Sequence, residues 1–247
     1  MRAILTFHGV DPSGSVLSIA PRELESLLEA LERRGFAIVP LDAIAAGTAP
    51  EDAVSLTFDD GFASVHDAAL PVLRAAGPPA SLFLTTGFLG RDNRWPGQPS
   101  FAPVFPLLDW KGVEALARAG VTIEAHTVHH PDLRRLSDAA LEDELAGCDD
   151  AIEKRIGRAP RAFAYPYGFV DERVAGAARR RYGCAVTTEL AALRGGEDPH
   201  RLPRLDAFYL RDVRVHRRFG GLDFRAWLGA RALARGLRAR LAPLHAG

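Results

Sequence analysis

Several residue types are scarce in this sequence. Its 247 residues include two cysteines, Cys148 and Cys184, and arginine carries nearly all of the positive charge, with Lys111 and Lys154 as the lysines. The cysteines have no Cys-x-x-Cys or other metal-ligand spacing, which argues against a disulfide framework and predicts buried free thiols. No apolar run approaches the roughly 20 residues of a membrane-spanning helix. The apolar run at residues 3–7 is too short for a signal peptide, so we expect a cytoplasmic protein.

The sequence also has no net charge, because Lys+Arg 31 is balanced by Asp+Glu 31. With 47% hydrophobic residues, a chain of this length can bury a full core and is expected to form one large domain. The C-terminal part departs from this balance, since residues 200–247 contain 11 arginines and three aspartates, a net charge of +8. Apart from this basic region, nothing suggests nucleic acid as a partner.

Residues 223–247 are predicted to form a basic amphipathic helix. Its apolar face is expected to contain Phe224, Trp227, Leu228, Leu233, Leu237 and Leu241. The helix could pack on the body of the protein with its arginines in water, or it could make peripheral contact with an anionic membrane. We favour packing on the body, and we expect His216, which stands among arginines, to be solvated. The sequence does not define the oligomeric state.

Strand-like and helix-like segments alternate along the chain. The strand-like runs are residues 3–7, 36–40, 53–56, 80–84, 121–124, 163–165 and 185–188. Apolar residues at helical spacing predict helices at residues 21–34 and 110–119 and after Ser137. This alternation favours parallel strands in a (β/α) barrel, whose active site gathers at the C-terminal ends of the strands.

Two adjacent carboxylates, Asp59 and Asp60, end one of these runs in the segment Thr57-Phe58-Asp59-Asp60-Gly61. Like charges this close raise the pKa of one carboxyl unless a cation or a hydrogen-bond network compensates. A metal ion resolves this conflict, because one carboxylate becomes a ligand while the other stays free as a base. The alternative is an acidic surface turn, since Asp-Asp-Gly is ordinary turn chemistry.

A histidine cluster follows another strand-like run, in the segment His126-Thr127-Val128-His129-His130-Pro131. His126 and His130 are four residues apart, so one helical turn or a tight loop can direct both imidazoles at one point. Two histidines and one carboxylate form a facial set with open positions, which suits Zn, Fe or Co. A surface cluster of histidines is the alternative, and the neighbouring Asp-Asp strand end favours the metal site.

Residues 87–109 have no hydrophobic period and are predicted to form a long loop. Long loops in compact domains are often functional. Within this loop, Trp95 could stack on a sugar ring or could anchor the loop to the body of the protein, and Phe101 and Phe105 are among its other aromatic residues.

The two segments described above precede a third, Phe163-Ala164-Tyr165-Pro166-Tyr167-Gly168. These three segments, the Asp59-Asp60 segment, the histidine segment and this one, occur in that order over roughly residues 54–190. Together they resemble the motifs of the polysaccharide deacetylases, carbohydrate esterase family 4. The resemblance implies a distorted (β/α) barrel with fewer than eight regular strands. We therefore predict an α/β fold with a barrel of about seven strands, in a single domain over residues 1–222 that carries the C-terminal helix.

The resemblance also implies a set of roles. Asp60, His126 and His130 would bind one divalent metal ion, with Zn²⁺ expected ahead of Co²⁺, Ni²⁺ or Fe²⁺. Asp59 would be the catalytic base that activates water. Tyr167 would supply a backbone N–H to the oxyanion, and the alternative for Tyr167 is a core aromatic residue.

The sequence departs from the family pattern at Ala164, where many members have an arginine that orients the base. Arg204 is a candidate to supply this charge, and a surface arginine is the alternative. Tyr165 is a further candidate for substrate binding or base orientation.

The general acid is a second departure, because no late strand ends in the expected histidine. The first strand-like run ends in His8 instead, which is similar to a permuted branch of the family that includes deacetylases of poly-N-acetylglucosamine. His8 is therefore the predicted general acid, and a hydrogen-bonded histidine at a strand end is the alternative.

The predicted function is metal-dependent removal of an acetyl group from an N-acetylated sugar or glycoconjugate. A cytoplasmic enzyme cannot easily reach a cell-wall polymer, so a sugar nucleotide, a lipid-linked sugar or a small glycoside is considered as substrate. The alternatives are an O-acetyl or non-sugar amide substrate, and a noncatalytic sugar-binding module of the same fold. A phosphatase of the haloacid-dehalogenase type is disfavoured, because its two aspartates are separated by one residue.

Overall fold

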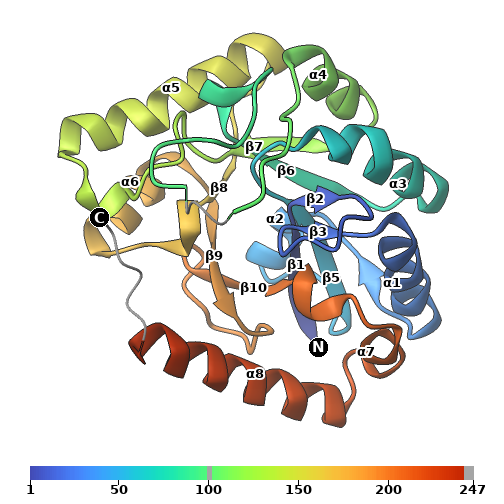
Figure 1. Ribbon diagram of the computed structural model, residues 1–247. Coiled ribbons are helices and arrows are strands. Elements are labelled where there is room, and N and C mark those ends of the chain that lie inside the picture. The colour runs from blue at the N-terminus through green and yellow to red at the C-terminus, as the bar shows by residue number, and fades with distance from the viewer. Residues whose placement is uncertain (99–101, 242–247) are drawn as a thin grey trace.

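The computed structural model describes residues 1–98 and 102–241, with side chains up to residue 237 at the C-terminal end, so that Phe101 lies outside the described residues. Within this part, seven parallel strands close a barrel (Figure 1). In order around the barrel they are β1 (Arg2–Phe7), β10 (Leu202–Asp206), β9 (Cys184–Leu190), β8 (Ala162–Ala164), β7 (Thr122–Ala125), β6 (Ala80–Leu84) and β5 (Ala53–Phe58), which pairs back to β1. The predicted barrel of about seven strands is confirmed.

Three short strands accompany the barrel. β4 (Ala37–Ile38) pairs with the start of β5 and extends that edge. β2 (Gly9–Val10) and β3 (Ser18–Ile19) pair with each other next to the C-terminal end of β1. This small sheet was not among the predicted elements, because two-residue strands carry no hydrophobic period.

Helices surround the barrel. They are α1 (Pro21–Arg33), α2 (Leu41–Ala45), α3 (Leu70–Ala76), α4 (Trp110–Arg118), α5 (Asp138–Ile156), α6 (Glu172–Arg181), α7 (Val213–Arg218) and α8 (Leu222–Leu241). A π-helical turn, η1 (Val65–Ala69), leads into α3, and single 3₁₀ turns occur at η2 (Thr86–Phe88), η3 (Leu133–Arg135), η4 (Pro166–Gly168) and η5 (Ala207–Leu210).

The ends of the 19-residue helix α5 follow from its sequence. The Ser137 side chain accepts a hydrogen bond from the Ala140 N–H, which satisfies one of the free N–H groups at the start of the helix. Gly157 ends the helix in the left-handed conformation with φ 82°, which a glycine adopts at low cost. The helices predicted at residues 21–34 and 110–119 are also present.

The first strand of the chain, β1, joins the two ends of the barrel sheet. It pairs with β5 from Arg2↔Ala53 to Phe7↔Phe58, and with β10 at Thr6↔Asp206. All six residues of β5 are buried, as expected for a parallel strand that is covered on both faces. Because all barrel strands are parallel, the residues that follow β1, β5, β7 and β8 meet at one rim of the barrel.

The C-terminal helix α8 differs from the prediction. Phe224 (0% exposed) and Leu228 (6%) face the barrel, whereas Leu233 (67%) and Leu237 (50%) are exposed. The expected single apolar face is therefore wrong, because a rotation of about 100° per residue places the first pair and the second pair on opposite sides of the helix. Leu241 lies beyond the described side chains, and residues 242–247 lie outside the described structure.

His216 also corrects the sequence analysis. It was expected to be solvated, but it is 1% exposed and lies between Leu210, whose carbonyl accepts from the Nε2 atom, and Ser26 on α1, 3.2 Å from the Nδ1 atom. The prediction was wrong because it was based on the flanking arginines, which point to water, while His216 faces α1. The expected buried free thiols, in contrast, are confirmed for Cys148 and Cys184.

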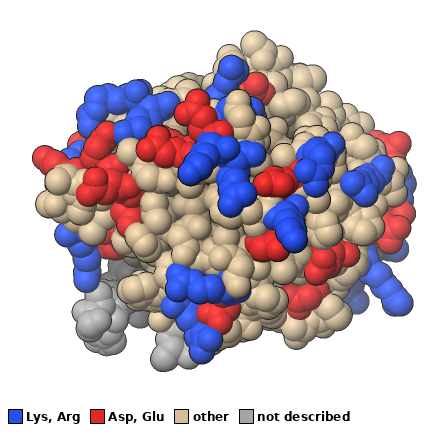
Figure 2. All heavy atoms as spheres, turned by 90° about the horizontal axis from the view of Figure 1, so that it is seen from above, with Lys and Arg blue, Asp and Glu red and all other residues tan. Residues whose placement is uncertain are grey.

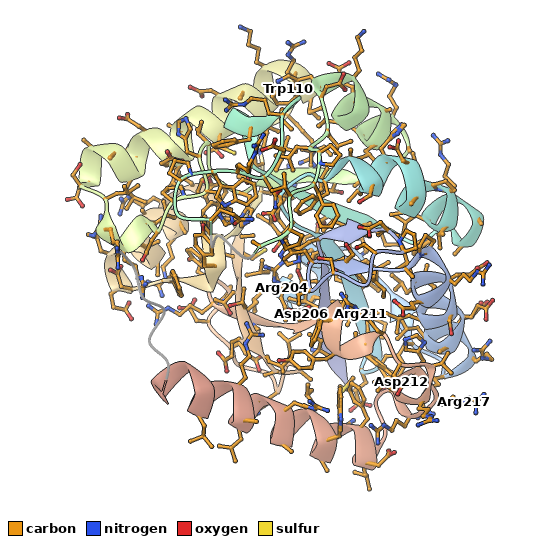
Figure 3. All side chains as sticks on the ribbon, viewed as in Figure 1. Trp110, Arg204, Asp206, Arg211, Asp212 and Arg217 are labelled. Carbon is orange, nitrogen blue, oxygen red and sulfur yellow. The ribbon has the colours of Figure 1, made fainter. Side chains whose placement is uncertain are left out.

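The surface seen in Figure 2 carries basic and acidic side chains next to one another, with no large area of one sign. No described helix is long and apolar enough to cross a membrane. Figure 3 shows Arg204 near the middle of the molecule, whereas Arg217 lies at its edge.

Candidate active site

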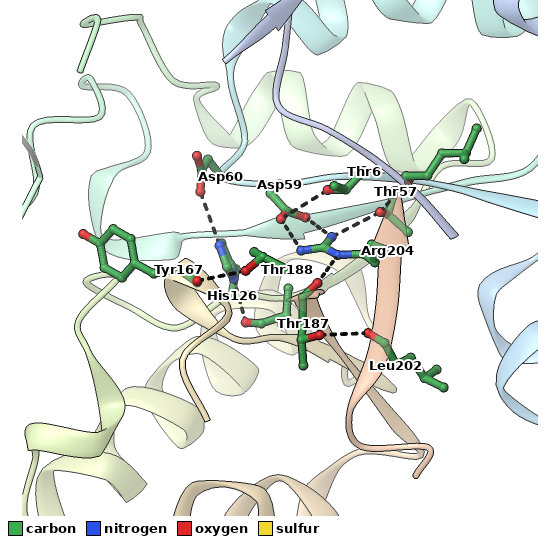
Figure 4. Close-up of polar contacts among 12 residues, drawn as sticks. Thr6, Thr57, Asp59, Asp60, His126, Tyr167, Thr187, Thr188, Leu202 and Arg204 are labelled. Carbon is green, nitrogen blue, oxygen red and sulfur yellow. Dashed lines mark hydrogen bonds and ion pairs between the residues drawn. The ribbon is translucent and has the colours of Figure 1, made fainter. Parts of the chain in front are cut away.

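The two carboxylates that end β5 are buried at the barrel rim. Asp59 is 3% exposed and Asp60 is 4% exposed. Asp60 has a φ of 72°, in the left-handed region that non-glycine residues rarely adopt, and Gly61 follows with φ 89°. Such a backbone costs about 1–3 kcal/mol, so the surrounding structure must stabilise it. The sharp turn separates the two side chains, which have different neighbours (Figure 4). The acidic surface turn considered above is therefore excluded.

Asp60 faces the two histidines of the loop after β7. The Oδ1 atom of Asp60 is 3.3 Å from the Nε2 atom of His126 and 3.6 Å from the Nε2 atom of His130. All three side chains are buried, and their potential ligand atoms lie within 4.8 Å of one another. The structure thus brings together the three residues predicted to bind a metal ion.

Hydrogen bonding indicates that this set fits a cation. The Nδ1 atom of His126 is 2.7 Å from the carbonyl oxygen of Ala164, which can only accept, so Nδ1 carries a hydrogen. In the neutral imidazole, Nε2 then presents a lone pair toward Asp60. The Oδ1 atom of Asp60 is itself buried without a hydrogen-bond partner among the described residues. Converging lone pairs in a buried place suit a divalent ion with nitrogen and oxygen ligands.

The electrostatics of the two histidines differ. Burial lowers the pKa of His130 to about 3, which leaves its imidazole neutral and able to act as a ligand. Burial also lowers the pKa of His126, but the carboxylates of Asp60 and Asp59 outweigh this effect and raise it. Burial raises the pKa of Asp60, and the two histidines more than offset this, so the carboxyl is held as the anion.

The loop that carries the histidines is a tight turn and not a helix. Thr127 and His130 have φ values of 69° and 59°, and the Oγ1 atom of Thr127 accepts from the His130 N–H at 2.9 Å. Glu144 on α5 holds the outside of the turn, where its carboxylate accepts from the N–H groups of Val128 (3.0 Å) and His129 (2.8 Å). Its other oxygen is 2.7 Å from the Nδ1 atom of His129.

Glu144 could not be singled out from the sequence. It lies in an acidic stretch of α5 with Glu142 and Asp143, and no local signal distinguishes it from them. Only the packing of α5 against the loop after β7 gives it a role.

Asp59 forms a buried ion pair with Arg204 of β10. The two guanidinium nitrogens donate to the two carboxylate oxygens at 2.8 and 2.6 Å, and Arg204 is 1% exposed. The same side chain donates to the Oγ1 atom of Thr57 at 3.2 Å and to the carbonyl oxygen of Thr187 at 2.8 Å. Burial raises the pKa of Asp59, but Arg204 outweighs it and holds the pKa below its usual value. The alternative of a surface arginine is excluded.

This arrangement explains how the chain accommodates Ala164. The charge that the resemblance assigns to an arginine of the third segment comes here from β10, two strands away from β8 in the barrel sheet. Ala164 itself contributes its backbone carbonyl, which accepts a hydrogen bond from the Nδ1 atom of His126.

The predicted aromatic residues have different surroundings. The ring of Tyr167 is 4.5 Å from that of His130, in a turn with φ 58°. The ring centroid of Trp95 lies 4.4 Å from that of His130. Trp95 is 4% exposed, so it is covered by its neighbours and anchors the loop after η2. Tyr165 is fully buried, and its hydroxyl donates to the carbonyl of His200. Both side chains are covered by their neighbours in the described structure, and their predicted roles toward the substrate or the base stay predictions.

The turn at Tyr167 depends on the glycine that follows it. Gly168 has a φ of 74°, and a Cβ atom at this position would lie 2.6 Å from the backbone nitrogen of Thr188. The Thr188 hydroxyl donates to the Tyr167 carbonyl at 3.1 Å. The close approach of β9 thus fixes the peptide of Tyr167 beside His130.

His8 follows β1 at the same rim and is half-buried. When protonated, it lowers the pKa of both Asp59 and Asp60, which places it within electrostatic reach of the pair. It also borders a small hollow together with Asp206 and Phe208. His66 is also half-buried, but it lies on η1 and pairs with Asp67.

Comparisons with known proteins agree with this geometry. Residues 46–185, more than half of the chain, match the family model for polysaccharide deacetylase. YxkH of Bacillus subtilis (strain 168), whose name assigns it provisionally to the polysaccharide deacetylases, is 26% identical over 231 residues, which is 91% of this chain and 75% of YxkH. The poly-beta-1,6-N-acetyl-D-glucosamine N-deacetylase of Staphylococcus epidermidis is 26% identical over 176 residues, or 66% of this chain and 58% of that protein.

Solved structures share the fold. The Streptococcus pyogenes deacetylase PplD in complex with acetate has a TM-score of 0.71 at 24% identity, covering 83% of this chain and 91% of PplD. IcaB from Ammonifex degensii has the same TM-score and identity, covering 87% of this chain and 97% of IcaB.

Proposed function

Since the chain belongs to the polysaccharide deacetylase family, we propose that it hydrolyses the acetamido group of an N-acetylated sugar with the help of one divalent metal ion. The observation that carries the proposal is the pair of buried aspartates with separate partners. Asp60 faces two histidines, and Asp59 is held by an arginine. One carboxylate is thus available as a ligand and the other as a base.

Asp60, His126 and His130 would hold the ion, with Zn²⁺ the expected metal because tetrahedral sites with nitrogen and oxygen ligands suit it. When bound, such an ion acts as a Lewis acid on the acetyl carbonyl and lowers the pKa of water. The tight turn at Thr127 and the Glu144 carboxylate keep the two imidazoles directed at one point.

Asp59 accepts the proton of the attacking water. Arg204 has two effects on this residue: it fixes the plane of the carboxylate through two hydrogen bonds, and it keeps the carboxylate ionised through the neutral pH range. Thr57 and Thr187 in turn fix the guanidinium group. A base that is held in this way does not have to be reoriented during the reaction.

His8 donates the proton that the departing amine needs, because an amide anion is too poor a leaving group at neutral pH. General acid catalysis of this kind contributes about 10²–10⁴-fold to the rate. The backbone N–H of Tyr167 stabilises the negative charge that develops on the acetyl oxygen. The C–N bond breaks, and acetate and the free amine leave.

The substrate class rests on the relatives. The staphylococcal proteins are named for N-deacetylation of poly-beta-1,6-N-acetyl-D-glucosamine, and we propose an N-acetylglucosamine-containing glycan as the substrate class for this chain as well. The alignment covers 58% of that protein, so substrate features outside the matched part are not transferred.

Acetate release from a panel of sugars tests the proposal. N-acetylglucosamine oligomers with β-1,6 and β-1,4 linkage, an O-acetylated sugar and a simple acetamide would be incubated with metal-depleted and metal-reloaded protein. Release from N-acetylated oligomers that requires the metal supports the proposal. Release from the O-acetylated sugar alone would assign an esterase instead, and no release from any substrate would favour a noncatalytic sugar-binding module.

A further inference from the structure

The outward side of α8 is apolar, which is unusual for the solvent side of a surface helix. Leu222 is 86% exposed, Leu233 67% and Leu237 50%. Rotation of about 100° per residue places these leucines on one side, and the exposed residues Ala226, Gly229 and Ala230 lie between them. We call this set, Leu222, Ala226, Gly229, Ala230, Leu233 and Leu237, the outward face of α8.

The opposite side of the helix accounts for its attachment to the protein. Phe224 and Leu228 are buried against the barrel, and the ring of Phe224 lies 4.8 Å from that of Phe219. Core packing therefore uses the inward side, and the leucines of the outward face have no partner among the described residues. Figure 3 shows side chains of α8 that point away from the barrel.

Positive charge lies on the other sides of the helix, because rotation of about 100° per residue places Arg231 and Arg235 opposite the outward face. Residues 213–241 contain eight arginines and one acidic residue, Asp223. Arg218 and Arg231 lie over the ring of Trp227, at 5.3 and 5.6 Å from its centroid. This composition contrasts with the mixed charges on the surface in Figure 2. Long arginine side chains can keep their charged ends in a polar layer while their stems cover apolar groups.

The positive charge of α8 distinguishes between two possible partners of its apolar outward face, a second copy of the chain and a lipid surface. A second copy of the chain would bring two strongly basic helices together, and like charges at close range oppose this. An anionic lipid surface supplies the complementary charge and an apolar layer at the depth of the leucines. Exposed leucines on one side of a helix with arginines on the other are typical of helices that lie in the plane of such an interface.

We propose that α8 binds the surface of an anionic lipid bilayer, with its outward face in the acyl region and its arginines at the lipid phosphates. The helix begins near the N-terminal end of β1, since Arg225 borders the same surface hollow as Met1 and Asp52. His8 follows the other end of β1, so α8 joins the barrel at the end opposite to the catalytic rim. The rim stays free for a glycan that reaches it from solution.

Sedimentation with lipid vesicles tests this inference on the full-length protein. Vesicles of equal parts phosphatidylglycerol and phosphatidylcholine would be compared with vesicles of phosphatidylcholine alone. We expect binding to the anionic vesicles only, weakened by salt because the charges lie at the surface. L233Q/L237Q removes two apolar contacts and should lower the partition coefficient at least about tenfold. R231Q/R235Q should lower it by roughly 25-fold, since each basic residue near the surface contributes about fivefold.

Val104→Gln is the matched control, because Val104 is 52% exposed and lies outside α8. It should bind like the wild type, and all variants should keep the wild-type unfolding midpoint. Equal binding of the wild type and L233Q/L237Q, or equal binding to neutral vesicles, would overturn the proposal. So would a wild-type dimer in light scattering that L233Q/L237Q converts to a monomer, since the outward face would then cover a second copy.

Discussion

Replacing Arg204 with methionine breaks the buried ion pair with Asp59, the proposed base, and should show how much stability is lost. Met fills a similar volume without charge, so Asp59 becomes a buried carboxylate at 3% exposure with no cation. Removing one partner of a buried ion pair typically costs about 3–5 kcal/mol, because the remaining charge is left without its water or its partner. We expect this loss in the free energy of unfolding at neutral pH, measured by urea denaturation of metal-depleted protein.

The pH dependence gives the sign of the effect. In the wild type, the folded pKa of Asp59 is depressed, so the pair stabilises the fold above the unfolded pKa of about 3.9 and loses this contribution as the pH falls. In the R204M variant only His126 and His8 still oppose burial, so we expect burial to raise the folded pKa of Asp59, and the variant then loses stability as the pH rises through that pKa. The difference between the two proteins should therefore shrink toward pH of about 4.

The double variant D59N/R204M serves as the control. Its neutral side chains leave no charge unpaired, so it should be more stable than R204M, and the two single losses should exceed the double loss by at least about 2 kcal/mol. Additive losses, or a difference between wild type and R204M that does not change with pH, would refute the ion-pair account.

Three further predictions concern the same rim and its supports. His8→Ala should keep the metal content and lower turnover of an N-acetyl sugar by about 10²–10⁴-fold, with a smaller loss on an aryl acetate whose phenolate leaves unprotonated; equal losses would indicate a positioning role. Glu144→Gln weakens the clamp on the histidine loop and should reduce metal affinity about 10–100-fold with little change in stability, measured by competition with a chelator. The thiols of Cys148 and Cys184, whose pKa burial raises to about 12, should react with a thiol reagent only after denaturation.

The sequence was informative wherever neighbouring residues carried the chemistry. Asp59-Asp60 and the His126 to His130 loop are each local, and their positions at strand ends place them on one rim once the barrel closes. His8 could be placed for the same reason, because the run before it ends like the other barrel strands. The structure agrees with these placements.

Contacts between distant segments could not be predicted in this way. Arg204 meets Asp59 across 145 residues of sequence, and the two come together because β1 pairs with β10 on one side and with β5 on the other. Tyr165 and Tyr167 are two residues apart, yet one is in the core and the other beside His130, because the turn η4 begins between them and Tyr167 has a φ of 58°. In α8 the apolar residues were predicted to share one face. Their angular positions around the helix, which that prediction did not use, place them on two opposite faces.

The central claim is that Asp60 holds the ion while Asp59 acts on the water. Metal content and acetate release, measured on the same reloaded samples of wild type, Asp60→Asn and Asp59→Asn with an N-acetylglucosamine oligomer, test it most directly. We predict one bound ion in the wild type, loss of both ion and activity in Asp60→Asn, and an ion retained with turnover mostly lost in Asp59→Asn. Equal metal content in the wild type and Asp60→Asn, or substantial activity in Asp59→Asn, would contradict the account.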